Sequence, residues 1–183
     1  MTVRVASLFA LCGTVLAFGR CSAPDRVSPL DQSQPSTTPG MSGAMPSPPS
    51  AVRPLPSNAV LYDGTNSLLS EPEIRIIADA AGWALAWQQL HAGMSVGREP
   101  RVDFAHERVV LIVMGERTTG GHSIRATGVS DTPGGGLVLH GVRVSPAPGC
   151  MAMAVMTAPA MAVRLPRAAG GIQVQMRNEV TSC

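Results

Sequence analysis

The chain has 183 residues, 45% of them hydrophobic and 14% charged, so it has the apolar content for one buried core and a sparsely charged surface. Its net charge is +2 without any block of basic residues, which argues against a nucleic-acid-binding protein. The 16 prolines and 19 glycines are unevenly spread, and their placement divides the chain into an N-terminal signal, a linker and a folded domain.

Residues 1–21 are typical of an export signal. Arg4 is followed by an apolar run over residues 5–18, which has the length of a signal-peptide core and is short for a transmembrane span. We therefore expect an exported protein, located in the periplasm or the cell envelope.

Two processing sites are open at the end of this signal. Cleavage at the small-x-small triplet that ends at Gly19 would release a soluble protein, whereas Cys21 lies where a bacterial lipoprotein carries its acylated cysteine. Arg20 and Phe18 depart from the usual residues of a lipoprotein site. The cysteine count favours lipidation, because an unmodified Cys21 would be an odd thiol in an oxidising compartment. We expect membrane anchoring through a lipid on Cys21.

Residues 22–58 are rich in Pro, Ser, Thr and Gly and have hardly any bulky apolar side chains. Such a segment buries too little surface to offset the entropy lost on ordering, so we expect it to be disordered. Together with the signal, it predicts a tether that holds a single domain of residues 59–183 away from a membrane.

One helix is predicted, with Asp79 as its N-cap and its end at about Leu90. Trp83, Trp87 and Leu90 are spaced four and three residues apart and therefore share one face. Such a stripe most often packs a helix onto a sheet, and we expect this packing rather than a ligand groove. Gly93 is a suitable stop for the helix.

The centre of the domain is predicted over Val109–Val129. A buried apolar strand (109–114) precedes a glycine-containing connection (115–121), and polar and apolar residues then alternate along a second strand. Two such strands on either side of a glycine connection predict a β-hairpin.

Other short runs, with turn residues between them, predict the remaining strands. They cover residues 58–66, 73–78, 137–144, 151–156, 161–165 and 172–176. Short strands at near-regular spacing with one added helix predict a mainly β (α+β) domain. We expect an antiparallel sandwich or a partly open barrel, with the helix packed near Asp79–Leu90.

A disulfide is predicted between Cys150 and Cys183, the only two cysteines in the folded domain. After export they would tie the last strand and the C-terminus to the proline-containing turn before Cys150. The loop-entropy model assigns such a bond roughly 3–4 kcal/mol of stability.

Five short motifs occur in one order between residues 73 and 166. They are Trp83-x-x-x-Trp87, Val102-Asp103-Phe104, Gly115–Gly121 (GERTTGG), Pro146-x-Pro148-Gly149-Cys150 and Thr157-x-Pro159. This series resembles the PrcB C-terminal domain family, which is named for a lipoprotein subunit of a bacterial surface protease complex. Thr118 stands where the family usually has proline, and His122 where it has an aromatic residue. The resemblance implies an exported accessory domain that binds or stabilises a protein partner, without established catalytic residues.

Motifs for catalysis or cofactors are not found in the sequence. The loop 115–121 lacks the lysine of a P-loop and leads into a strand, and no Gly-x-Ser-x-Gly motif is present. The histidines are isolated in the sequence: His91, His106, His122 and His140. Neither they nor the cysteines have the close paired spacing of a metal site, so we expect no metal and no cofactor. His122 and Ser123 are strand neighbours that point to opposite faces, so we expect no catalytic pair there.

The glycine-containing connection is the predicted binding surface. Its residues are Arg117, Thr118, Thr119, Gly120, Gly121 and His122. Loops of this kind carry binding residues, and His122 would make the surface sensitive to mild acid near pH 6.5. The favoured hypothesis is a non-enzymatic, envelope-tethered domain that binds a protein partner, as an accessory or stabilising subunit of a secreted or surface peptidase. Two alternatives stay open: a purely structural hairpin, and a small hydrolase or ligand-binding domain with a pocket near His122.

Overall fold

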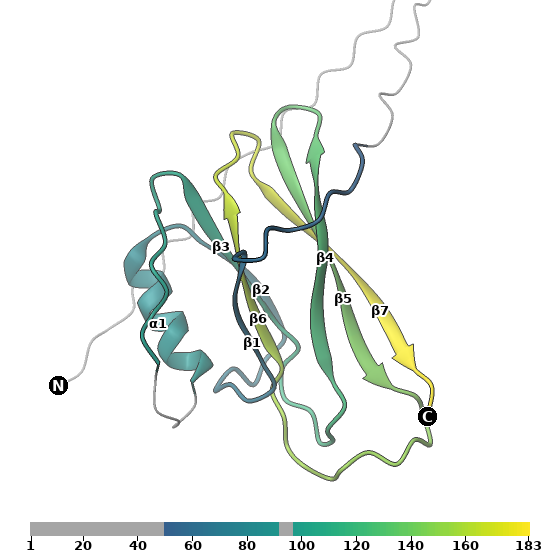
Figure 1. Cartoon of the computed structure of the whole chain (residues 1–183). Coiled ribbons are helices and arrows are strands. Elements are labelled where there is room, and N and C mark those ends of the chain that lie inside the picture. The colour runs from purple at the N-terminus through teal and green to yellow at the C-terminus, as the bar shows by residue number, and fades with distance from the viewer. Residues whose placement is uncertain (1–49, 92–96) are drawn as a thin grey trace, which may run out of the picture. The chain divides into compact units, whose positions relative to one another are not determined.

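The computed structural model describes residues 50–91 and 97–183, and its central strand is β3 (Glu107–Val113) (Figure 1). The side chains of Val109 and Leu111 enter one hydrophobic core, and those of Val110 and Ile112 enter a second core on the opposite face; all four are 0% exposed. A strand that is buried on both faces needs a continuous apolar sequence, which β3 has. The buried strand predicted over 109–114 is therefore confirmed.

Two sheets and one helix form three layers, with the four-stranded sheet in the middle (Figure 1). The middle sheet is antiparallel throughout and has the order β1-β6-β3-β2. Besides β3, its strands are β1 (Val60–Gly64), β2 (Glu73–Ile77) and β6 (Ala160–Pro166). The second sheet has the order β4-β5-β7, with β4 (Ser123–Thr132), β5 (Gly136–Pro146) and β7 (Ile172–Thr181).

This architecture confirms the predicted fold class, a mainly β sandwich with one packed helix. One part of the prediction is wrong, because the sandwich is not purely antiparallel. β4 and β5 form an antiparallel hairpin, but β7 runs parallel to β5. Two parallel strands need a long crossover connection between them. Here β6, which lies between β5 and β7 in the sequence and belongs to the other sheet, is part of that connection.

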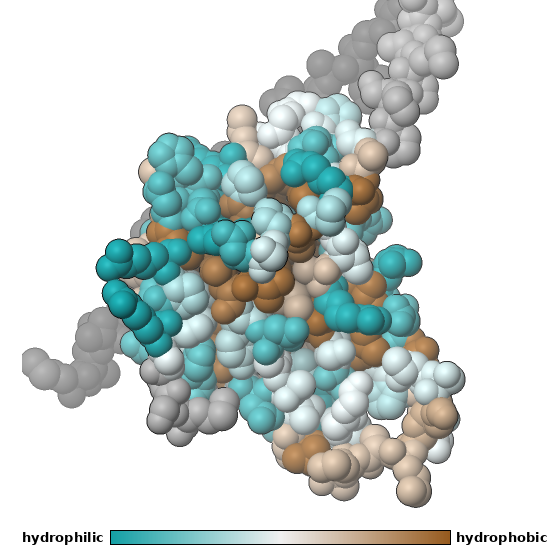
Figure 2. Space-filling view, viewed as in Figure 1, coloured by the Kyte–Doolittle hydropathy of each residue, from teal (hydrophilic) through white to brown (hydrophobic). Residues whose placement is uncertain are grey.

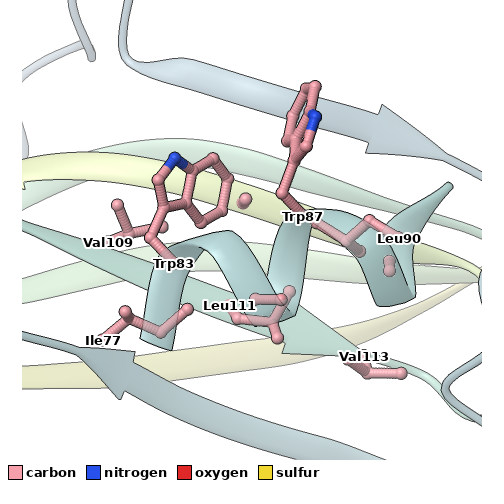
Figure 3. Packing of buried hydrophobic residues seen from close by; sticks show 10 residues of the cluster. Ile77, Trp83, Trp87, Leu90, Val109, Leu111 and Val113 are labelled. Atoms are coloured by element: carbon pink, nitrogen blue, oxygen red, sulfur yellow. The ribbon is translucent and has the colours of Figure 1, made fainter. Parts of the chain in front are cut away.

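Helix α1 (Ala80–Leu90) covers the outer face of the four-stranded sheet (Figure 3). It begins where predicted, because the Asp79 side chain accepts a hydrogen bond of 2.8 Å from the Gly82 amide as an N-cap. Trp83 and Trp87 are 1% and 7% exposed and pack against the β3 side chains, which confirms their predicted core role. The predicted stop at Gly93 lies outside the described residues.

The N–H group of each buried indole also donates a hydrogen bond to a backbone carbonyl. The Nε1 of Trp83 donates to the carbonyl of Pro100 at 3.1 Å, and the Nε1 of Trp87 donates to the carbonyl of Gly97 at 3.0 Å. A buried N–H without a partner would be unfavourable, so these two bonds allow the rings to be core residues. They also attach the segment after the helix to the helix itself.

The predicted hairpin of β3 and β4 is wrong. β3 is hydrogen-bonded to β2 on one side and to β6 on the other, so it has no free edge to offer β4. The connection instead crosses from one sheet to the other, and β4 pairs with β5. Two apolar strands joined by a glycine loop can form a hairpin or can lie in two different packed sheets. The local sequence is the same in both cases, and only the strands that pair with each of them, which lie far away in the sequence, distinguish the two.

The predicted strand over 151–156 is also wrong. This segment connects β5 to β6 without a ladder, and a single isolated bridge joins Thr157 to Arg117. Its apolar composition is typical of a buried strand, but several of its side chains are exposed. The strand predicted over 172–176 is confirmed and continues to Thr181.

Residues 50–58 lie against the domain, although the sequence predicted them as the end of a disordered tether. Arg53 exchanges two backbone hydrogen bonds of 2.9 Å with Val129 of β4, and its guanidinium contacts the Asp131 carboxylate at 2.7 Å. Leu55 packs on the core between the sheets. Gly128 lies beneath this segment, and a Cβ there would be 2.6 Å from the Arg53 carbonyl oxygen. The remainder of the predicted tether and the export signal lie outside the described residues.

Cys150 and Cys183 form the disulfide that the sequence predicted, with their Cα atoms 5.5 Å apart. The bond joins the segment after β5 to the residue that ends the chain, two positions beyond β7. A backbone bond of 3.0 Å from the Ala147 amide to the Thr181 carbonyl lies beside it. Within the described residues, no helix is long and apolar enough to cross a membrane.

Candidate functional site

Two connections meet at one end of the sandwich. The glycine loop (Gly115–Gly121) runs from β3 to β4, and the methionine segment (residues 151–156) runs from β5 to β6 at the lower end of Figure 1. Their backbones are joined by a reciprocal pair of hydrogen bonds between Arg117 and Thr157, of 2.7 and 2.9 Å, and by a bond of 2.9 Å from the Gly120 amide to the Met153 carbonyl. The predicted binding loop is thus one half of a two-part surface.

Glycine is required at position 115 by the chain's own packing. Gly115 has φ of 75°, and a Cβ there would lie 2.8 Å from both the Ser70 carbonyl oxygen and the Pro72 ring. The next amide, that of Glu116, donates to the same Ser70 carbonyl at 2.8 Å. The close backbone approach at this position is therefore made by residues 70–72 of the same chain.

The six predicted binding residues differ in their accessibility. Thr118 and Gly121 are exposed, whereas Arg117, Thr119, Gly120 and His122 are half-buried. The Arg117 guanidinium donates to the Met114 carbonyl at 2.7 Å, and the Thr119 carbonyl accepts from the Thr157 hydroxyl at 3.1 Å. Of these six residues, Thr118 is therefore the one whose side chain is both polar and exposed.

His122 connects the glycine loop to the end of β5. Its Nε2 lies 3.2 Å from the Thr119 hydroxyl, and its Nδ1 lies 3.2 Å from the Ser145 hydroxyl. Partial burial and, secondly, the nearby Arg117 charge lower the pKa of His122 below its ordinary value of 6.5. Its protonation therefore requires a lower pH than that of an ordinary histidine.

A hydrolase site near His122 would draw on Asp103 or Ser123, and no hydrogen bond joins either of them to His122 among the described residues. The Asp103 carboxylate contacts the Nδ1 of His106 at 2.8 Å, and this hydrogen bond is the main cause that lowers the pKa of Asp103. Ser123 pairs with Val144 in the β4–β5 ladder, and His122 is held by other hydroxyl groups.

Metal-binding groups were not expected from the sequence. Within residues 50–91 and 97–183, no three His, Cys, Asp or Glu side chains are grouped so that they could hold a metal ion.

The methionine segment exposes a run of apolar side chains. Met151 is 103% exposed, Met153 76%, Met156 54% and Val155 42%. Figure 2 shows apolar colours over this lower end of the domain. Isolated apolar residues on a surface are ordinary, but a contiguous exposed patch typically marks an interaction site.

A shallow hollow lies on each side of the glycine loop. One, of about 280 Å³, is lined by Met151, Met153 and Val155 together with Gly121 and Pro146. The other, of about 270 Å³, has a more polar lining and includes Ser70, Glu116, Met156 and Thr157. The two connections therefore line an apolar hollow and a second hollow of mixed polarity.

Sequence reasoning missed the methionine segment, which was assigned to a strand. The available signal was its composition: Met151, Met153 and Met156 are separated only by Ala and Val, and Pro148 and Pro159 flank the run. Methionine is frequent on binding surfaces that adapt to their partners, because its unbranched thioether chain is flexible.

The comparisons with known proteins bear on this same part of the chain. No curated protein and no solved structure matches the chain. Residues 108–166 match the family model described as PrcB C-terminal. They extend from β3 to the end of β6, and so include both the glycine loop and the methionine segment. The part of the chain that builds the candidate site thus matches the PrcB C-terminal family, as its sequence motifs predicted.

Proposed function

We propose that this protein is a non-enzymatic, exported and envelope-tethered domain that binds a protein partner through the glycine loop and the methionine segment. The partner proposed is a secreted or surface peptidase, for which the domain serves as an accessory or stabilising subunit. The observation that carries this proposal is the exposed apolar run from Met151 to Met156 beside the glycine loop.

The chemistry of this surface suits a protein partner. Between Arg143 and Arg164 the sequence contains no charged residue and no histidine, so a partner can cover the methionine segment without stripping water from a charge. Burial of apolar area contributes about 25 cal/mol per Å², and each exposed methionine offers such area. Thr118 and Glu116, both exposed, supply polar groups at the rim, where interfaces are usually polar.

The proposed location in the cell envelope is inferred from the N-terminal sequence. An export signal ending near Cys21 would place the domain outside the cytoplasm, and a lipid on Cys21 would anchor it. With residues 50–58 packed on the domain, the tether that we propose consists of residues 22–49. A coil of that length has an end-to-end distance on the order of 30 Å, more where prolines stiffen it. An intact mass of the mature protein distinguishes acylation of Cys21 from cleavage at Gly19.

A pull-down from solubilised envelope tests the binding surface. The variant Met153→Asp places a charge in the exposed apolar run, and Leu85→Asp is the matched control, because Leu85 is also exposed (53%) but lies on α1. A third variant, Thr118→Glu, changes the exposed tip of the glycine loop.

We expect Met153→Asp and Thr118→Glu to lose a partner that the wild type and Leu85→Asp retain, with all variants showing the same thermal unfolding. A partner set that Met153→Asp and Thr118→Glu leave intact would refute this surface as the binding site. Absence of a peptidase among the partners lost would refute the proposed partner class alone.

A further inference from the structure

The methionine segment concentrates one kind of metal ligand. Three thioethers, those of Met151, Met153 and Met156, occur within six residues, and only Ala and Val separate them. Cys150 is held in the disulfide, so its sulfur is not a thiolate. Carboxylates and imidazoles are missing from the sequence between Arg143 and Arg164. The segment itself therefore offers soft sulfur donors alone, and Glu116 of the glycine loop is a carboxylate that lines the same hollow as Met156.

The backbone of the segment is attached to the domain at three points, and two of its methionine side chains are largely exposed. The disulfide of Cys150 holds one end, the paired backbone of Arg117 and Thr157 holds the other, and the Met153 carbonyl accepts from the Gly120 amide between them. The Met151 and Met153 side chains are 103% and 76% exposed. These attachments reduce the backbone ordering that a ligand of the sulfur atoms would require.

The spacing brings two of the three thioethers to the same side. Met151 and Met153 are two residues apart and both line the hollow of about 280 Å³ beside the glycine loop. A hydrogen bond of 2.9 Å from the Val155 amide to the Met153 carbonyl then turns the chain before Met156. Met156 lines the neighbouring hollow and is half exposed, so rotation about its own side-chain bonds is needed to bring its sulfur toward the pair.

Thioethers are selective ligands. They are soft donors that favour Cu(I), whereas Mg²⁺ and Ca²⁺ require oxygen ligands and Zn²⁺ is usually held by thiolate, imidazole or carboxylate. We propose that Met151, Met153 and Met156 form a binding site for Cu(I), in which Met151 and Met153 are the primary pair and Met156 is the third ligand. Because a thioether carries no proton to lose, this site binds without proton release, unlike a thiolate or imidazole site.

The test uses the full exported chain with its disulfide intact and any free thiols blocked with iodoacetamide. Cu(I) is generated under anaerobic conditions with ascorbate, which leaves the disulfide oxidised, and is titrated against a coloured Cu(I) chelator. Ag(I), a Cu(I) analogue without redox chemistry, is added in a parallel experiment that follows the methionine methyl signals by NMR. Zn²⁺ is the comparison ion.

We expect one Cu(I) per chain, with an affinity that is the same at pH 7 and pH 5.5, and no binding of Zn²⁺. The variant Met151→Leu/Met153→Leu should lose the site and Met156→Leu should weaken it, whereas Met161→Leu, at a buried position, should bind as the wild type does. Ag(I) should shift the methyl signals of the three methionines and not that of Met161.

Failure of the wild type to compete with the chelator would overturn the proposal, as would equal binding by the wild type and the Met151→Leu/Met153→Leu variant. This outcome is separable from the proposed partner binding. Leucine keeps the surface apolar and uncharged, so the double variant should still capture the protein partner that Met153→Asp loses.

Discussion

Removal of the Cys150–Cys183 disulfide should lower the stability of the domain substantially. The two cysteines are 33 positions apart, and closing a loop of that size in the unfolded chain corresponds to about 4 kcal/mol in the loop-entropy model. For a domain of about 130 residues, a loss of this size lowers Tm by roughly 10–15 °C. The bond also secures β7, an edge strand of its sheet that ends two residues before Cys183.

The variant Cys150→Ser/Cys183→Ser measures this contribution in urea unfolding followed by circular dichroism, with the reduced wild type as a second sample of the open chain. Hydrogen exchange should show the largest loss of protection in β7, because its ladder to β5 is its described strand pairing. A loss of stability below about 1 kcal/mol would show that the constraint on the unfolded chain is not what the bond supplies. Equal loss of protection in β3 and β7 would refute the local role at the C-terminus.

Three other perturbations test the core, the glycine loop and its histidine. Trp83→Ala removes a side chain that is 1% exposed, and urea unfolding should show a loss of about 3–5 kcal/mol, with a smaller loss for Trp83→Phe. Gly115→Ala introduces a Cβ at 2.8 Å from the Ser70 carbonyl at positive φ, so it should destabilise by more than about 1 kcal/mol, whereas Gly97→Ala, with open space around it, should be nearly neutral. For His122, the lowered folded-state pKa means that its contribution to stability is complete above pH 6.5 and is lost as the pH falls through the folded value. The free energy of unfolding of the wild type should therefore fall relative to that of His122→Gln on acidification. A relative rise below pH 6.5 would contradict the direction of the shift.

Local features of the sequence predicted several elements correctly. Asp79 followed by the stripe of Trp83, Trp87 and Leu90 predicted both the start of α1 and the face that it buries. The run 109–114 predicted a buried strand, and three of the five motifs, from Gly115 to Pro159, lie within residues 108–166, which match the family model. These signals succeed because an N-cap, a helical stripe and a strand buried on both faces are encoded within a few neighbouring residues.

The functional surface was predicted only in part, because it depends on contacts between residues that are far apart in the sequence. The glycine loop was singled out, but its backbone pairing with Thr157, 40 positions after Arg117, depends on where β6 enters the sheet. The exposed methionine segment has the composition of a buried strand, and only its place outside both sheets leaves its side chains in solvent.

The sequence by itself determined which residues are apolar, where the helix begins and which two cysteines could pair. The tertiary structure decided which strands are neighbours, that β3 lies between β2 and β6 rather than beside β4, and that β7 runs parallel to β5. The physical reason is that an apolar strand can form its backbone hydrogen bonds with any partner strand of suitable register. The choice among partners is made by packing the two cores of the whole domain at once.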